Sequence, residues 1–355
     1  MLLCTFSLFT HPQHPLPVIR ASSPYHMPPT ISGAVDFIAG LHRLPRLPPP
    51  PAASPNDFHI ESTPHVLRKR YNVTKVGTAS NNSQAVFAAL GQHFTQLDLD
   101  EFWAEFGEWF PHSHRVEKVV GPNHPPSGVE ASLDVQYIMS LGANISTWFW
   151  SMAGLHEGQE PFLQWMIDVG NTTEVPYLFS VSYGDDEDSL SIEYMQRINV
   201  EFQKAGLRGI SILIASGDSG AGCNDNSTAF TPNFPVSSPY VTGVGGTAWG
   251  SSADHEITNY LSGGGFSNVF TRPDYQAQAV DAFLHSNASH PLPPSSYFNA
   301  SGRAYPDVAA MSEGFPVVSN LIPTPGVAGT SCATPTFSGI VALINDARLA
   351  AGKPR

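Results

Sequence analysis

A nearly unbroken apolar run at residues 210–215, Ile-Ser-Ile-Leu-Ile-Ala, narrows the choice of fold more than any other segment. A strand that is apolar almost throughout is typical of a parallel sheet covered on both faces. Other short apolar runs that predict strands lie at 145–150, 177–182 and 241–244. Patterns with helical spacing lie at 159–169, 189–205 and 334–351. This alternation predicts an α/β fold with a mainly parallel central sheet and helices on both faces.

The composition changes near residue 57. Residues 1–57 hold 12 of the 32 prolines, four of them in succession at 48–51. Such a segment cannot form a regular helix or a central strand, so we interpret it as a linker or the remnant of a longer N-terminal region. Residues 58–355 have the composition of one continuous folded domain, in which Ser-Thr-Pro at 62–64 predicts a helix start.

Charge and hydropathy exclude two classes of partner. Thirty Asp and Glu against 17 Lys and Arg give a formal net charge of -13, and the basic residues form no long run that could follow a phosphate backbone. Nucleic acid is therefore not an expected partner. No apolar stretch reaches the length of a membrane-spanning helix, so no membrane span is expected either.

The glycosylation pattern favours the secretory route. Asn-x-Ser/Thr occurs seven times, at Asn72, Asn81, Asn144, Asn171, Asn226, Asn287 and Asn299. Residues 1–9 make a poor signal peptide, because the apolar run has neither a basic region before it nor a small-residue cleavage site after it. The three cysteines, Cys4, Cys223 and Cys332, are an odd number, so at least one thiol is unpaired within the chain.

The strongest local motif is Gly-Thr-Ser-Cys-Ala-Thr-Pro at 329–335, which is followed by apolar residues at helical spacing. It predicts that Ser331 lies at a helix N-terminus, where unpaired N–H groups and the helix dipole can stabilise an oxyanion. Ser331 is therefore a candidate nucleophile. The alternative is that Ser331 or Thr330 only caps the helix. We interpret Cys332 as a small packing residue.

A serine nucleophile needs a base, and Glu130 with Asp134 can supply it. Four residues apart on a helix, the two carboxyl groups share a face that continues through the apolar residues Tyr137, Ile138 and Leu141. Partial burial and like-charge proximity raise carboxyl pKa values, so the pair could hold a proton for transfer. The alternative is an ordinary solvated helix face.

Asp218 lies in a glycine-rich loop, Ser-Gly-Asp-Ser-Gly-Ala-Gly at 216–222, directly after the predicted buried strand. Such a loop gives backbone clearance for a substrate. A protonated Asp218 could donate a hydrogen bond to the oxyanion, which predicts activity at acidic pH. Two alternatives are a simple turn residue and a trypsin-like Gly-Asp-Ser-Gly motif with Ser219 as nucleophile. The latter belongs to all-β enzymes with an upstream His base.

Glu130, Asp134, Asp218 and Ser331, in this order and with these flanking sequences, resemble the sedolisin family of serine-carboxyl peptidases, and within it the animal tripeptidyl-peptidase type. The resemblance implies a subtilisin-like fold and runs from about residue 35 to the end of the chain. Residues 35–43 resemble the tail of the family's propeptide. The other matching stretches lie at 68–72, 158–165, 182–189 and 262–270.

The resemblance implies a mechanism and a substrate. Ser331 attacks the scissile carbonyl, Glu130 is the general base, Asp134 orients Glu130 and shares its protons, and Asp218 holds the oxyanion. The implied substrates are small or unfolded proteins with free N-termini, from which tripeptides are released in the lysosome. The segments expected beside the substrate, with ordinary loop glycines as the alternative, are Ser182, Tyr183, Gly184 and Ser262, Gly263, Gly264.

The resemblance also implies parts that this chain does not match. The family's large propeptide, which is a partner of the full-length enzyme, is mostly missing or replaced, and we cannot align residues 1–30. The chain ends at Arg355, 24 residues after Ser331, before the segment that carries the family's calcium site. Calcium is therefore expected for the family, but no metal ligand is assigned in this chain. Cys223 resembles a family cysteine whose disulfide partner lies in that same segment.

Two other functions remain open from the sequence. An ordinary subtilisin-type endopeptidase shares the Gly-Thr-Ser helix start but uses a histidine base, and the chain has no His-Gly dipeptide to match it. We interpret His156 as a loop residue. A truncated, inactive product that acts only as a binding or regulatory protein is the third hypothesis.

Overall fold

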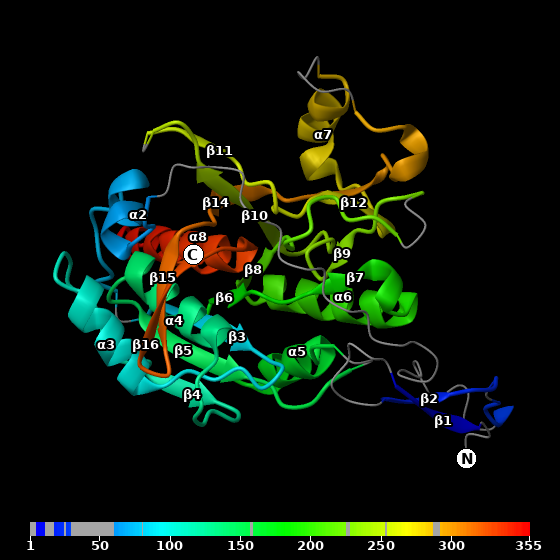
Figure 1. Ribbon diagram of the computed structural model, residues 1–355, viewed down its shortest axis with the longest axis horizontal. Coiled ribbons are helices and arrows are strands. Elements are labelled where there is room, and N and C mark those ends of the chain that lie inside the picture. The colour runs from blue at the N-terminus through cyan, green and yellow to red at the C-terminus, as the bar shows by residue number, and fades with distance from the viewer. Residues whose placement is uncertain are drawn as a thin grey trace.

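The computed structural model describes residues 5–10, 18–24, 26–29, 60–79, 81–156, 159–224, 228–252, 254–286 and 292–355. Its main element is an eight-stranded sheet with the order β11-β10-β8-β6-β3-β5-β4, in which β14 also pairs with β10 (Figure 1). Every pairing in this sheet is parallel except that of β10 with β11, which confirms the expected sheet type. The strands are β3 (Ser83–Ala88), β4 (Lys118–Val120), β5 (Ser146–Ser151), β6 (Leu178–Val181), β8 (Ser211–Ala215), β10 (Thr242–Trp249), β11 (Glu256–Thr258) and β14 (Val308–Met311).

Helices cover both faces of this sheet (Figure 1). Strand β8 shows the arrangement, because Leu213 belongs to one buried cluster while Ile212 and Ile214 belong to another. Successive side chains of a strand point to opposite faces, so each cluster lies on its own face. One cluster includes residues of α2 (Pro64–Arg70), α3 (Gln96–Phe106), α4 (Val129–Leu141) and α8 (Thr330–Ala350), and the other includes residues of α5 (Phe162–Asn171) and α6 (Ile192–Leu207).

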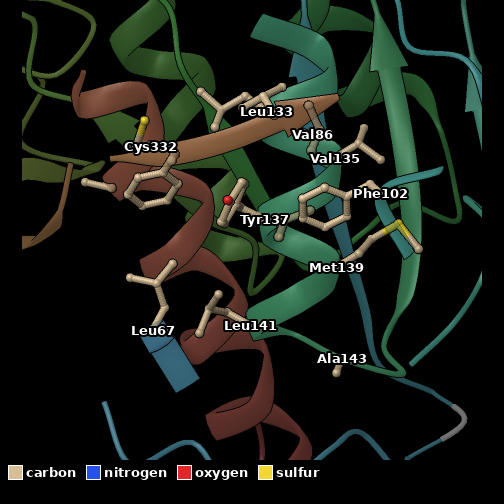
Figure 2. Packing of buried hydrophobic residues seen from close by; sticks show 14 of the residues in the cluster. Leu67, Val86, Phe102, Leu133, Val135, Tyr137, Met139, Leu141, Ala143 and Cys332 are labelled. Carbon is tan, nitrogen blue, oxygen red and sulfur yellow. The ribbon is translucent and has the colours of Figure 1, made fainter. Parts of the chain in front are cut away.

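Helices α4 and α8 pack directly against each other, and Figure 2 shows Tyr137 of α4 beside α8. Gly339 permits this close approach, because a Cβ at that position would lie 2.4 Å from the backbone nitrogen of Gly142. Residues 131–141 of α4 are all buried. The expected apolar stripe was therefore too narrow a prediction, because α4 also packs against the sheet and against strand β15 (Phe315–Ser319).

Several boundaries differ from the sequence expectation: α5 and α6 begin at Phe162 and Ile192 rather than at 159 and 189, and two other boundaries differ by more. Helix α8 begins at Thr330 rather than at 334, with Pro335 inside it. Proline is most common in the first turn of a helix, so its position suggested a start that is too late. Strand β10 continues to Trp249, well beyond the expected 241–244, because Gly245 and Gly246 interrupt its apolar pattern without ending the strand.

The remaining elements are small. Among the described residues, four two-stranded antiparallel pairs lie outside the central sheet. They are formed by β1 (Phe6–Phe9) with β2 (Val18–Ala21), β7 (Asp185–Asp186) with β9 (Asn233–Phe234), β12 (Gly265–Thr271) with β13 (Gly302–Tyr305), and β15 with β16 (Ile322–Val327). The short helices are η1 (Glu187–Ser189), η2 (Asp274–Gln276), α7 (Ala277–Leu284) and η3 (Ser295–Tyr297).

Candidate active site

A cleft of about 210 Å³ opens where strands β6 and β8 end and helix α8 begins. Parallel strands bring their carboxyl ends to one edge of a sheet, where ligands bind in folds of this kind. The segment after β6 contributes Ser182, the loop after β8 contributes Asp218, and α8 contributes Ser331. Three of the segments singled out in the sequence thus meet at one place.

Ser331 lies in the first turn of α8, as predicted, but it does not cap the helix. The N-cap is Gly329, which has no side chain to make a capping hydrogen bond. The capping alternative for Ser331 and Thr330 is therefore wrong. Gly329 has a φ of 149°, and a Cβ there would lie 2.8 Å from Oδ2 of Asp218, so only glycine fits without displacement.

Thr330 ties the start of α8 to the loop after β8. Its backbone N–H and its hydroxyl both donate to Oδ1 of Asp218, at 2.7 and 2.8 Å. The same hydroxyl accepts a hydrogen bond from the backbone N–H of Gly217 at 3.1 Å. The next residue, Ser331, lines the cleft.

Glu130 and Asp134 both lie on α4, and Glu130 is next to Ser331 of α8. Asp134 is fully buried and its Oδ1 accepts a hydrogen bond of 2.7 Å from the Ser182 hydroxyl. Burial raises the pKa of Glu130 to about 7; the Ser331 hydroxyl, as a hydrogen-bonding neighbour, lowers this pKa in part, whereas the charge of Asp218 adds to the increase. Burial and then the charge of Glu130 raise the pKa of Asp134 well above its usual value.

The electrostatic contacts of Glu130 show which predicted residues the fold brings together. Glu130 interacts with both Ser331 and Asp218, which come from α8 and from the loop after β8. Oε1 of Glu130 and Oδ2 of Asp134 are enclosed and have no hydrogen-bond partner among the described residues. Two interacting carboxyl groups of this kind retain a proton at pH values where isolated carboxyl groups are ionised.

The two expected substrate segments lie in different places. Ser182, Tyr183 and Gly184 line the cleft beside Ser331. Ser262, Gly263 and Gly264 do not line it and border a separate, larger and mainly apolar pocket.

The glycine at position 263 has a structural reason. Its N–H donates to the carbonyl of Gly217 at 2.6 Å, and a Cβ there would lie 2.0 Å from the carbonyl oxygen of Ser216. The predicted close backbone approach exists, but it is made to the loop that carries Asp218. The sequence signals close approach without identifying the partner.

Glu160 is a cleft residue that the sequence reasoning missed. It lies within a stretch that supported the family resemblance, yet a Glu directly before a helix is usually a solvated end charge. In the structure only 5% of Glu160 is exposed, and it lines the cleft with Ser331. Burial raises its pKa to about 7. No feature of the local sequence distinguishes a buried carboxyl group from an exposed one at such a position.

The alternative nucleophiles and bases do not line the cleft. Ser219 is exposed on the loop after β8, and no histidine is among the cleft residues. His156 stacks on Tyr194 with ring centroids 3.9 Å apart. Cys332 is buried within the α4–α8 layer (Figure 2), and burial raises the pKa of its thiol well above the usual value. Its position agrees with a packing role.

Several predicted features lie outside the cleft. Of the seven predicted glycosylation sites, four are exposed: Asn72, Asn81, Asn144 and Asn171. Asn299 is half-buried, and Asn226 and Asn287 lie outside the described residues. Cys223 is an exposed free thiol, while Cys4 is not among the residues described.

Within the described part of the chain, no group of three or more His, Cys, Asp or Glu could hold a metal ion. Over the same residues, no helix is long and apolar enough to cross a membrane.

The fold and the cleft define a class: a subtilisin-like α/β domain with a serine at a helix start and with several carboxyl groups near it, among them Glu130 and Asp218. In agreement, sedolisin from Pseudomonas, a serine-carboxyl proteinase solved with pseudo-iodotyrostatin, shares the fold with a TM-score of 0.61 and 20% sequence identity, over 83% of this chain and 82% of that one. No protein-family model matches the chain.

Sequence comparison narrows the class. The chain is 54% identical to tripeptidyl-peptidase 1 of Rattus norvegicus and of Homo sapiens over 351 residues, and to that of Mus musculus over 350 residues. Each match covers 95% of this chain and 62% of the relative, so the chain spans less than two thirds of the length of these relatives. The resemblance drawn from the motifs is confirmed: over 95% of its length the chain is similar to tripeptidyl-peptidase 1, and it shares its fold with sedolisin.

Proposed function

We propose that this domain is an acid-acting serine-carboxyl peptidase that releases tripeptides from the free N-termini of peptides and unfolded proteins. The observation that carries the proposal is the contact of Ser331 with Glu130, a carboxyl group whose pKa burial raises to about 7. Once ionised, a carboxylate with a raised pKa accepts a proton from a serine hydroxyl more readily than an ordinary carboxylate does, and protonation of Asp218 would lower this pKa toward the acidic working range. The tripeptide product is inferred from the relatives that carry this name.

In the proposed first step, the Ser331 oxygen attacks the carbonyl carbon of the scissile bond while its proton passes to Glu130. The carbonyl oxygen becomes an oxyanion that accepts hydrogen bonds from protonated Asp218 and from backbone N–H groups at the start of α8. Glu130 then gives its proton to the leaving amine, and the acyl group stays on Ser331. A water molecule, deprotonated by Glu130, releases the peptide and restores the serine.

Asp134 supports Glu130, the proposed base, from the same helix. It is fully buried, is held by the Ser182 hydroxyl, and interacts electrostatically with Glu130. Because Glu130 and Asp134 share a proton, the enclosed site does not have to hold two negative charges at once. This gives Asp134 the role of orienting Glu130 and moderating its charge during both proton transfers.

Acidic pH suits this arrangement for a specific reason. The role proposed for Asp218 requires its carboxyl group to be protonated. The negative charge of Asp218 is one of the causes that raise the pKa of Glu130, so protonation of Asp218 lowers that pKa. Protonation of Asp218 would therefore both create the oxyanion donor and lower the pKa of the base.

The remaining family properties are also proposals for this chain. We place it in the lysosome by way of the secretory pathway, on the strength of its seven sequons and its family. The propeptide of the longer relatives is a proposed partner. The calcium ion of the family finds no ligand set among the described residues, so no step of the mechanism depends on it.

The test compares two fluorogenic tripeptide substrates at about pH 4.5, one with a free N-terminal amine and one with that amine acetylated. The purified chain should cleave the first and not the second, and Ser331→Ala should cleave neither while it keeps the wild-type melting temperature. Equal cleavage of both substrates would indicate an endopeptidase. Binding of peptides without turnover would support a purely binding protein.

A further inference from the structure

The cleft beside Ser331 has an unusual balance of charge. Two carboxyl groups, Glu160 and Asp218, line it, and none of its twelve lining residues is Lys, Arg or His. The mechanism uses Asp218 at the oxyanion and gives Glu160 no task. Because a carboxyl group is costly to bury, a Glu in this position calls for an explanation.

Local structure holds Glu160 at the cleft. It stands between β5 and α5, immediately before the N-cap Pro161, and its carbonyl accepts a hydrogen bond of 2.9 Å from the N–H of Phe162. Burial raises the pKa of its carboxyl group to about 7; hydrogen bonds from its own backbone and from that of Gly184 oppose the increase, and the charge of Asp185 adds to it.

The titratable groups around Glu160 are acidic or neutral near pH 7. Tyr183 and Asp218 share the cleft with it, and Asp185 faces it from β7. On its own loop His156 stacks on Tyr194 of α6 instead of entering the cleft. An ionised Glu160 therefore has no cation in the cleft, and a substrate can supply one.

We propose that Glu160 sets the charge preference of this cleft for the substrate side chain on the amino side of the scissile bond. The cleft takes neutral side chains while Glu160 is protonated, and takes lysine or arginine once Glu160 is ionised. This inference rests on the proposed peptidase function, because it places the substrate with its scissile bond at Ser331.

The size of the cleft agrees with such an occupant. Its volume of about 210 Å³ equals the liquid volume of roughly seven water molecules. A lysine side chain has five heavy atoms beyond Cα, so it can enter in an extended form and bring its ammonium group to a carboxyl group inside. Pairing with a cation stabilises the ionised carboxylate, so in the complex Glu160 ionises at a lower pH than in the free protein.

The experiment measures kcat/KM for two substrates that differ only at this position, Ala-Ala-Lys and Ala-Ala-norleucine coupled to the same fluorogenic amine, from pH 4.5 to 7. The two side chains share the same four-carbon chain and differ only by the terminal ammonium group of lysine, so the ratio of their kcat/KM values cancels the pH dependence of the catalytic groups. The lysine-to-norleucine ratio should rise at least 10-fold across this range in the wild type. In Glu160→Gln it should stay flat.

Glu193→Gln is the matched control, because Glu193 is an exposed acid on α6 that is not among the cleft residues. Its ratio should rise as in the wild type. A flat ratio in the wild type, or a rise that survives in Glu160→Gln, would overturn the inference. Melting temperatures of both variants confirm that they are folded.

Failure of the proposed peptidase function is distinguishable from failure of this inference. If the wild type cleaves neither substrate, binding of the uncoupled peptides Ala-Ala-Lys and Ala-Ala-norleucine is measured by calorimetry at pH 4.5 and 7. A lysine preference that appears only at pH 7 and disappears in Glu160→Gln still supports the role of Glu160. Equal binding at both pH values contradicts it.

Discussion

Replacing Thr330 by valine tests how the site is held together. Valine keeps the shape of threonine and removes only the hydroxyl, which donates to Oδ1 of Asp218 at 2.8 Å and accepts from the N–H of Gly217 at 3.1 Å. The backbone N–H of residue 330 still donates to Asp218 at 2.7 Å. The substitution therefore loosens Asp218 without releasing it.

The size of the effect follows from these contacts. A hydrogen bond to a charged group contributes about 1.5–3 kcal/mol, and a donor left without a partner costs about 1–3 kcal/mol. We expect Thr330→Val to lower the free energy of unfolding by about 2 kcal/mol. If half to all of a similar energy is lost where Asp218 contacts the oxyanion, kcat falls by roughly 5-fold to 30-fold, since about 1.4 kcal/mol corresponds to a factor of ten.

The assay separates positioning from a general loss of structure. Asp218 is proposed to contact the oxyanion only in the transition state, so kcat should fall while KM changes little. Thr330→Ser keeps the hydroxyl and should recover most of kcat. A Thr330→Val enzyme with the wild-type kcat, or a Thr330→Ser enzyme as slow as the valine variant, would refute this account of the site.

Three other perturbations address the oxyanion, the loop that carries Asp218, and the buried carboxyl groups. Asp218→Asn should lower kcat at acidic pH on the order of 10²-fold, as removal of an oxyanion donor does, and an unchanged kcat would exclude that role. Gly263→Ala places a Cβ 2.0 Å from the Ser216 carbonyl oxygen and should destabilise the fold in urea by about 1–3 kcal/mol, whereas Gly206→Ala, with open space around it on α6, should be neutral or stabilising. Burial raises the folded-state pKa of Glu130 and Glu160 to about 7 and that of Asp134 well above its usual value. The contribution of these groups to stability is therefore complete below about pH 4, their unfolded pKa, and that of Glu130 and Glu160 is lost as pH rises through about 7. Urea denaturation should therefore show lower stability at pH 7 than at pH 4.5, with a smaller difference in Glu160→Gln, and equal slopes in the two proteins would count against burial of that charge.

The sequence allowed accurate prediction where one local property has one structural outcome. The run at 210–215 is apolar on both faces, and no environment other than a covered strand suits it, so β8 was found. Ser331 was placed at a helix start because glycine and threonine before it and apolar spacing after it all agree. Local patterns do not reveal which segments lie close together in space, and only the family resemblance indicated that these segments form one site.

Prediction failed where a residue's role depends on a distant partner. Strand β3 was missed because Gln84 interrupts its apolar pattern. In the fold that side chain is fully buried, and its Nε2 donates to the carbonyls of Ile138 and Gly142 and to the Thr147 hydroxyl. The same limit applies to Glu160, whose burial follows from segments around residues 184 and 234 that no local pattern connects to it.

The contact at Gly339 has a consequence for inactivation. The helix that carries the base and the helix that carries the nucleophile rest on each other there, without an intervening side chain. Their spacing is fixed by the interior of the domain rather than by a surface loop. A small increase in the distance between α4 and α8 would separate Glu130 from Ser331 before the sheet unfolds. On gentle heating the protein should therefore lose activity while its circular dichroism spectrum is still that of the intact fold.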